Sequence, residues 1–330
     1  MIRELIALLP LIIVGAVPLS LNAQQKIDLS TNYIHSEKVS FKSKFFQKVA
    51  AIFKVKKLIE KKIVSKKYNQ NVAPMPKSLR SNYNTTVDTI KGRKIWTLKP
   101  KQNVSEKVIL YLHGGAYYWN ISKHNWAFAE RLLEKTNATF VIPDYSLAPH
   151  STFEQVYEYL DELYEELITR YGPENSIIMG ESSGGGLALG FTMFLRNENR
   201  PQPNQLILMA PWLDVTMRNS EILKVDKKDK ILGIKGLQLA GKGYAGENEM
   251  SNYKVSPING DLMGLTKIAL FVGTHDLFVA DSRKLRDNAH SLDLTMNYYE
   301  YPKMFHVWIL VNQLKEAKEA RKQIISLILD

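Results

Sequence analysis

The chain has 330 residues, of which 45% are hydrophobic and 23% charged, as in globular proteins with a large core. Its formal net charge of +11 is concentrated in residues 24–78, which hold 13 lysines against three acidic residues, whereas residues 79–330 are close to neutral. Nucleic-acid-binding proteins more often carry their charge on the folded face that meets the phosphates, so we expect no nucleic-acid partner. The absence of cysteine excludes disulfides, cysteine nucleophiles and thiolate metal ligands.

An apolar segment covers residues 5–21. It is close to the minimum length of a bilayer-spanning helix, and it ends in a sequence that loosely resembles a signal-peptide cleavage site. We expect residues 1–23 to be a cleaved secretory signal or an uncleaved membrane anchor, with a buried helix as the third possibility. The sequence therefore predicts a protein that is secreted or anchored at the cell envelope, on a side of the membrane that the flanking charges leave open.

The basic segment 24–78 follows. Within it, residues 41–64 repeat apolar side chains every three or four positions with lysines between them, which predicts an amphipathic helix, broken once. We expect this helix to pack its apolar side on the protein; the alternative is that residues 1–67 lie on an anionic membrane surface. Residues 69–76, with two prolines, are typical of a linker into the main domain.

Residues 79–330 are expected to form the main domain. Its first part, 84–98, predicts an antiparallel hairpin around a glycine turn. Short apolar runs then alternate with helical patterns, which is typical of a parallel sheet whose strands are covered on both faces. These runs are residues 108–112, 139–142, 176–179, 205–209 and 267–272. The fold class is therefore α/β, a mostly parallel sheet with helices on both faces.

One stretch, residues 214–260, interrupts this alternation. It is rich in lysine, glycine and asparagine, and it is long for a connection inside a compact domain. We expect it to hold helices above the sheet, which together with residues 24–78 form a helical cap.

The run at 176–179 leads directly into Gly180-Glu181-Ser182-Ser183-Gly184 and then into a helical pattern. This is a Gly-x-Ser-x-Gly motif between a strand and a helix. Such a turn raises the Ser182 hydroxyl above the carboxyl edge of the sheet and leaves no room for side chains at the two glycines. Ser182 is therefore the candidate nucleophile, and a glycine-rich structural turn is the alternative.

A second glycine turn, which begins at His113, follows the run at 108–112. Acyl transfer creates an oxyanion that needs backbone N–H donors already in place. The candidate donors in this turn are Gly114, Gly115 and Ala116, and Ser183 would supply another from the serine turn. Three aromatic side chains come next and either line a substrate pocket or pack in the core: Tyr117, Tyr118 and Trp119.

The partners of a catalytic serine in this fold follow it in the order acid, histidine, each after a later strand. Asp276 comes just after the run at 267–272. His306 follows a further strand-like run, residues 295–300, and lies in the loop before the last helical pattern. Asp281 is the alternative acid. His275 competes with His306, but an imidazole next to the acid in sequence cannot easily turn toward the serine.

Together these motifs resemble the hormone-sensitive-lipase-like family of α/β-hydrolases, which includes bacterial carboxylesterases, acetyl esterases and arylacetamide deacetylases. The matching segments are 113–117, 144–149, 180–185, 273–276 and His306. The resemblance implies an α/β-hydrolase fold in which Ser182 is the nucleophile, His306 the general base and acid, and Asp276 the carboxylate that orients the histidine. It also implies that the turn at His113 supplies the oxyanion donors.

This chain departs from the family pattern at three positions. Ala116 stands where a third glycine is usual, Glu181 where aspartate is common, and His150 where glutamate is common. Asp144, in the matching segment 144–149, is expected to be structural.

The predicted activity is that of a serine carboxylic-ester hydrolase for short- to medium-chain acyl esters, which works through an acyl-enzyme. We expect a small-molecule ester as substrate, no metal or organic cofactor, and no obligate protein partner. The alternatives are an amidase, formamidase or lipase with the same triad, and a catalytically silent binding protein of this fold.

Overall fold

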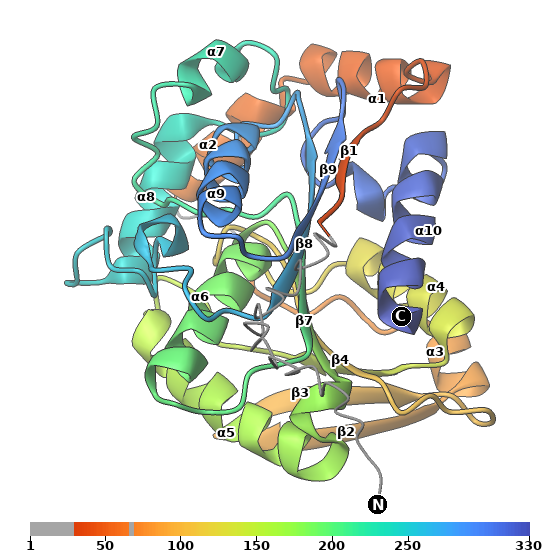
Figure 1. Ribbon diagram of the computed structural model, residues 1–330. Helices are drawn as coiled ribbons and strands as arrows, with labels where there is room; N and C mark the ends of the chain where they lie inside the picture. Colours follow the sequence, from red (N-terminus) through yellow and green to blue (C-terminus); the bar gives the residue numbers. More distant parts are fainter. Residues whose placement is uncertain (1–29, 66–68) are drawn as a thin grey trace, which may run out of the picture.

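A single sheet runs through the part of the molecule that the computed structural model describes, residues 30–65 and 69–330 (Figure 1). Nine described strands lie in the order β1-β9-β8-β7-β6-β4-β5-β3-β2. They are β1 (Asn32–Ile34), β2 (Asn84–Ile90), β3 (Arg93–Lys99), β4 (Val108–Leu112), β5 (Thr139–Pro143), β6 (Ser176–Glu181), β7 (Gln205–Met209), β8 (Lys267–Gly273) and β9 (Met296–Tyr301). All neighbours are parallel except β2 with β3 and β3 with β5, so the predicted α/β fold is confirmed.

Helices cover both faces of the sheet (Figure 1). One face carries α3 (Lys77–Asn82), α4 (Lys123–Thr136) and α10 (Lys315–Leu329), and the other carries α5 (Phe153–Tyr171), α6 (Ser183–Asn197) and α9 (Val279–Ser291). Side chains alternate between the two faces along a strand. In β4, for instance, Leu110 belongs to the apolar cluster around α5 and α6, and Tyr111 belongs to the cluster around α4 and α10. Because each face of such a strand packs into an apolar core, the strand appears in the sequence as a continuous apolar run.

Strand β1 is the element of the sheet that the sequence did not predict. It lies within the basic segment 24–78 and pairs in parallel with β9, with Tyr33 opposite Tyr299. Its three residues are too few for an alternating pattern to be recognised. Part of this segment therefore extends the edge of the sheet instead of forming a cap.

Helices α1 (Phe41–Ile52) and α2 (Val55–Val64) form the predicted amphipathic stretch, and the break falls at Lys54, whose φ is 49°. The two helices bury three side chains, Ser43, Ala50 and Ile63. Phe41 and Phe53, by contrast, are 81% and 67% exposed. The expectation that the apolar side packs on the protein is therefore wrong for these phenylalanines.

The stretch 214–260 holds α7 (Ile222–Asp226) and α8 (Ile234–Ala245), as expected for a helical insertion. Helix α8 packs against α2, and the Lys56 ammonium lies 2.5 Å from the Asp226 carboxylate at the start of this insertion (Figure 1). Two segments far apart in the sequence are thus joined.

The segment 69–76 contains no helix or strand and is held to the main domain by hydrogen bonds. Gln70 donates its side-chain N–H to the carbonyl of Ala148, and the Trp126 indole donates to the carbonyl of Ala73. The segment is therefore docked along its length and is not a free linker.

The predicted signal or anchor, residues 1–23, lies outside the described residues. Among the helices of residues 30–65 and 69–330, none has both the length and the apolar character that a bilayer crossing needs.

Candidate active site

Ser182 stands in the sharp turn between β6 and α6. Its backbone angles, φ 55° and ψ −123°, are unfavourable for a residue with a side chain, as this type of turn requires. A Cβ atom on Gly180 would lie 2.2 Å from the carbonyl oxygen of Gly184, and one on Gly184 would lie 2.1 Å from that of Leu112. Only glycine fits at both places, so the packing of α6 on the sheet holds Ser182 in its strained position.

The predicted serine, histidine and acid lie together. His306 Nε2 is 2.9 Å from Ser182 Oγ, and His306 Nδ1 is 2.8 Å from Asp276 Oδ2. All three side chains are buried. With its Nδ1–H donating to Asp276, the imidazole presents Nε2 as the acceptor for the Ser182 hydroxyl, which is the arrangement that activates a serine.

The two alternatives from the sequence lie elsewhere. His275 donates from Nδ1 to the Gln47 side-chain oxygen of α1 at 2.9 Å. Asp281 is buried and accepts a hydrogen bond from Asn219 at 2.8 Å. Neither side chain hydrogen-bonds to Ser182, so the geometry favours Asp276 and His306.

The charges around His306 strengthen it as a base. Burial lowers the pKa of His306, but the Asp276 carboxylate, together with the nearby carboxylates of Asp229 and Glu181, more than offsets this, and the net effect is a pKa above the usual value. A proton on this imidazole is therefore stabilised at the moment when the serine would lose one.

The turn that begins at His113 lies beside Ser182, but its N–H groups are not equivalent. Gly114 N–H donates to the Glu181 carboxylate at 2.5 Å and is therefore occupied. Within the described residues, Gly115 and Ala116 have no protein acceptor for their N–H groups, and Ser183 begins α6, where the first N–H groups have no acceptor within the helix.

This turn is strained at the residue that departs from the family pattern. Ala116 has φ 51°, a left-handed value that glycine adopts more readily. At Gly115, with φ 133°, a Cβ atom would lie 2.2 Å from the Trp119 carbonyl oxygen. The positions of these two N–H groups are therefore fixed by the fold before any ligand binds.

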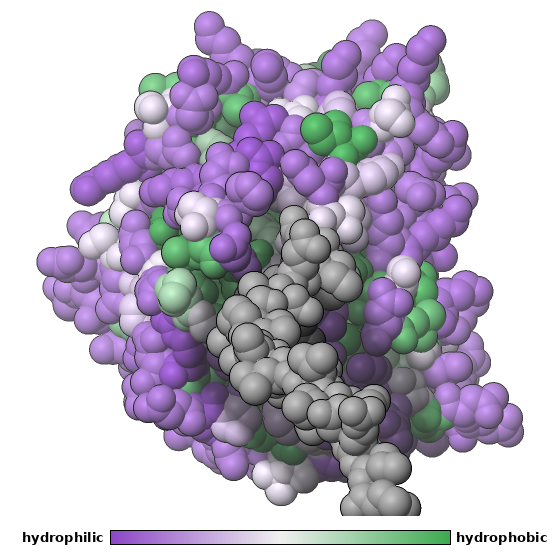
Figure 2. Space-filling model, viewed as in Figure 1, coloured by the Kyte–Doolittle hydropathy of each residue, from purple (hydrophilic) through white to green (hydrophobic). Residues whose placement is uncertain are grey.

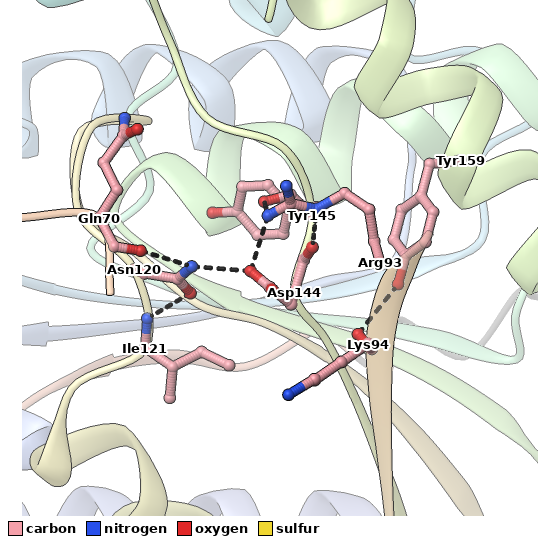
Figure 3. A network of polar contacts seen from close by, with 8 residues as sticks. All are labelled: Gln70, Arg93, Lys94, Asn120, Ile121, Asp144, Tyr145 and Tyr159. Carbon is pink, nitrogen blue, oxygen red and sulfur yellow. Dashed lines mark hydrogen bonds and ion pairs between the residues drawn. The ribbon is translucent and has the colours of Figure 1, made fainter. Parts of the chain in front are cut away.

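A partly buried network of hydrogen bonds supports the turn (Figure 3). Asp144 accepts hydrogen bonds from Arg93 at 2.8 Å and from Asn120 at 2.7 Å, and Asn120 also donates to the Gln70 carbonyl. Figure 3 shows Asp144 between these partners, so it joins β3, the loop after the glycine turn and the segment 69–76. Its contacts are those of the structural residue that the sequence predicts.

His113 is part of the same support. Its ring stacks on Tyr145, with centroids 4.4 Å apart, and its Nδ1–H donates to the Gly114 carbonyl at 2.7 Å. Burial lowers the pKa of His113 to about 4, so the imidazole is neutral at neutral pH. Its contacts shape the turn and do not reach Ser182.

A cavity of about 360 Å³ opens in front of Ser182. The glycine turn and Trp119 form one wall, and the other walls come from α2, from the insertion 214–260 and from the loop after His306. The residues from these other walls are Ile59, Lys62, Ile231, Leu232, Leu237, Val307 and Leu310. Both segments expected to form a cap thus line the cavity.

Of the three aromatic residues after the glycine turn, only Trp119 lines this cavity. Tyr117 is buried against the ring of Tyr244, with centroids 3.6 Å apart, and Tyr118 is also buried. The predicted substrate-binding role thus finds support only for Trp119, and the other alternative, core packing, describes Tyr117 and Tyr118.

Sequence reasoning missed two buried carboxylates next to the site. Burial raises the pKa of Glu181 to about 7, even though Gly114 and Asn125 both donate to it. Burial and the neighbouring Asp276 raise the pKa of Asp229 to about 6. Asp229 lies in the insertion and accepts the N–H of Leu277, the residue after Asp276, at 3.0 Å. The only signal in the sequence was the motif position of Glu181.

The raised pKa of Glu181 predicts that the protein becomes less stable to unfolding as pH rises. The folded state holds a proton that the unfolded state releases near pH 4.5, so stability is lost as pH rises from there through about 7. Glutamine at this position can still accept from Gly114 and Asn125. As pH rises across this range, we therefore expect the free energy of unfolding of Glu181→Gln to increase relative to that of wild type by up to roughly 3 kcal/mol. Denaturant unfolding of both proteins at pH 5 and pH 8 measures this difference. A difference that is the same at both pH values would contradict the prediction.

The sequence matches a model of the family described as alpha/beta hydrolase fold over residues 109–310. Among curated proteins, it is 29% identical over 222 residues to an esterase of Acinetobacter venetianus, which covers 66% of this chain and 73% of that protein. The region that the family model matches contains Ser182, Asp276 and His306.

Solved structures agree on the fold. A crystal structure of a Staphylococcus aureus protein assigned as an esterase superposes with a TM-score of 0.75 at 25% identity, over 84% of this chain and 92% of that one. A crystal structure of an esterase from the bacterial hormone-sensitive lipase family superposes with a TM-score of 0.70 at 23% identity, over 83% and 89% of the two chains.

Proposed function

The chain belongs to the α/β-hydrolase fold family as one of its hormone-sensitive-lipase-like carboxylic-ester hydrolases, and from this premise we propose that Ser182, His306 and Asp276 carry out the reaction. The observation that supports this proposal most strongly is the pair of contacts made by His306, at 2.9 Å to Ser182 and 2.8 Å to Asp276. The strained backbone of Ser182 adds to it, because strain of this kind is found where a side chain must be presented to a substrate.

In the proposed mechanism, His306 removes the proton of the Ser182 hydroxyl as its oxygen attacks the ester carbonyl carbon. The oxyanion that forms is stabilised by the N–H groups of Gly115, Ala116 and Ser183. His306 then gives its proton to the leaving alcohol, and an acyl-enzyme remains. Water, activated by the same imidazole, attacks the acyl-enzyme and releases the acid.

We assign α1, α2 and the insertion 214–260 to a cap above Ser182. Two observations support this role: side chains from α2 and from the insertion line the cavity, and α2 packs against α8.

The cavity volume of about 360 Å³ is near the lower end of the range for small-molecule sites, roughly 300–1,000 Å³. We therefore propose short- to medium-chain acyl esters as substrates. From the apolar segment 5–21, we also propose that the protein works at the cell envelope.

Reaction with a fluorophosphonate probe tests the proposal, because only an activated serine reacts. We expect one label per chain, on the peptide that contains Ser182, and no label on Ser182→Ala. The exposed Ser251→Ala is the matched control and should label like wild type. A series of p-nitrophenyl esters against a matched anilide then separates an esterase from an amidase. A label at any other serine, or faster turnover of the anilide, would contradict the proposal.

A further inference from the structure

Exposed apolar side chains are concentrated on α1 and α2. Within residues 41–64, seven large apolar side chains are exposed: Phe41, Phe45, Phe46, Ile52, Phe53, Leu58 and Val64. The rest of the described chain contributes only eight such side chains, spread over other elements. Single exposed apolar residues are normal on a soluble protein, but a group of this kind marks a binding surface. We call α1 and α2 with these side chains the helical patch.

The helical patch is strongly basic. Residues 41–64 contain eight lysines and one glutamate. One of the lysines, Lys56, pairs with Asp226, and seven others are exposed: Lys42, Lys44, Lys48, Lys54, Lys57, Lys61 and Lys62. Figure 2 shows mostly hydrophilic side chains on the upper part of the surface, where α1 lies in Figure 1, with a few hydrophobic ones between them. A partner must therefore accept aromatic side chains and carry negative charge at the same place.

We propose that the helical patch docks the protein on the surface of an anionic lipid bilayer. Phenylalanines inserted at the level of the headgroups and lysines against the anionic lipids are the combination by which interfacial helices bind membranes. A nucleic acid would satisfy the lysines but would leave most of the exposed aliphatic side chains in water. A second copy of this chain would bring like charges together.

The helical patch also borders a cavity that reaches the candidate active site. A second cavity, of about 630 Å³, is lined by Phe41, Phe45 and Phe46 of α1 on one side and by Phe305 and His306 on the other. It shares five residues with the cavity in front of Ser182: Ser122, Ile231, His306, Val307 and Leu310. The Phe46 ring stacks on that of Phe305, with centroids 4.7 Å apart.

This geometry gives an apolar route from the docked face to the site. An ester dissolved in the membrane surface would enter between α1 and the loop after His306 without crossing bulk water. This second step rests on the proposed function, whereas docking itself does not, and the two are tested separately.

Docking is tested with a fluorescent label, because the chain has no cysteine and a single introduced cysteine labels one position. Full-length Phe53→Cys carries an environment-sensitive nitrobenzoxadiazole label, and Met263→Cys is the control. Their wild-type side chains are 67% and 57% exposed, and Met263 lies before β8, at the opposite end of the parallel strands. Vesicles of phosphatidylglycerol with phosphatidylcholine are compared with vesicles of phosphatidylcholine alone.

We expect the label at position 53 to shift to the blue with anionic vesicles only, the shift to weaken at high salt, and the label at position 263 not to respond. An unresponsive label at position 53 overturns the proposal. So does a response to duplex DNA instead of vesicles, a response to protein concentration without lipid, or emission that is already blue-shifted before vesicles are added, as when residues 1–29 cover the patch.

A second experiment separates docking from chemistry. In Lys54→Gln/Lys57→Gln, neither altered residue lines a cavity, and we expect the affinity for anionic vesicles to fall by about tenfold or more. Hydrolysis of soluble p-nitrophenyl butyrate should stay unchanged, while hydrolysis of an ester dissolved in the anionic vesicles should fall. Unchanged vesicle affinity overturns the proposal. Loss of both activities together would instead mean that the two lysines act on the site itself.

Discussion

Ser182→Ala is expected to lower kcat for p-nitrophenyl butyrate by roughly 10⁵- to 10⁶-fold. The alanine variant has no oxygen to form the acyl-enzyme, and the small residual rate would come from water attacking an ester held by Gly115 and Ala116. The hydrolysis rate of the purified variant at saturating substrate measures the effect. Ser251→Ala is the control for the loss of an exposed hydroxyl. Retention of more than about 1% of the wild-type rate would contradict the role of Ser182, since loss of the nucleophile of a serine hydrolase costs far more than a hundredfold.

The same prediction has a stricter form. If Ser182 and His306 act as a unit, removing both should cost no more than removing Ser182 alone, because the imidazole has no task without the hydroxyl. We therefore expect Ser182→Ala and Ser182→Ala/His306→Ala to have equal residual rates. A double variant slower by the product of the two single effects would mean that His306 acts on the substrate independently.

The elements that sequence reasoning predicted well are those whose signal is local. The strands from β4 to β8 are buried on both faces, so each appears as a continuous apolar run, and the structure confirms them within one or two residues. The turn at Ser182 was equally visible, because steric limits at Gly180 and Gly184 leave no other residue possible there. In both cases the structure of a segment can be predicted from the residues of that segment alone.

What was missed depends on contacts between distant segments. Gly114, Gly115 and Ala116 are indistinguishable as donors in the sequence, and only the position of Glu181, 67 residues later, shows that the Gly114 N–H is occupied. Asp229 gave no signal either, because its partner Leu277 lies 48 residues away.

The helical patch is a different case. Its periodicity correctly predicted amphipathic helices, but periodicity does not tell which environment the apolar side meets. Phe41 could equally have packed on the protein, and only its exposure decides between the two.

Asp276→Asn is expected to lower kcat by roughly 10⁴-fold while leaving the fold intact. Asp276 accepts the His306 Nδ1–H at 2.8 Å and is fully buried, so its charge stabilises the imidazolium directly. An asparagine can turn its amide N–H toward Nδ1, which then must accept, and the proton moves to Nε2, where it blocks the Ser182 hydroxyl. The rate of ester hydrolysis, with thermal unfolding as the check on folding, measures the effect.

Asp229→Asn is the matched comparison, because Asp229 is also a buried carboxylate whose charge raises the pKa of His306 but which makes no hydrogen bond to it. We expect a small loss of rate and a shift of the acidic limb of kcat/KM to lower pH. The sign follows because removing a nearby negative charge lowers the pKa of His306, so the imidazole stays neutral to a lower pH. Equal losses in the two variants would mean that the negative charge near His306, and not the Asp276 hydrogen bond, sustains the reaction.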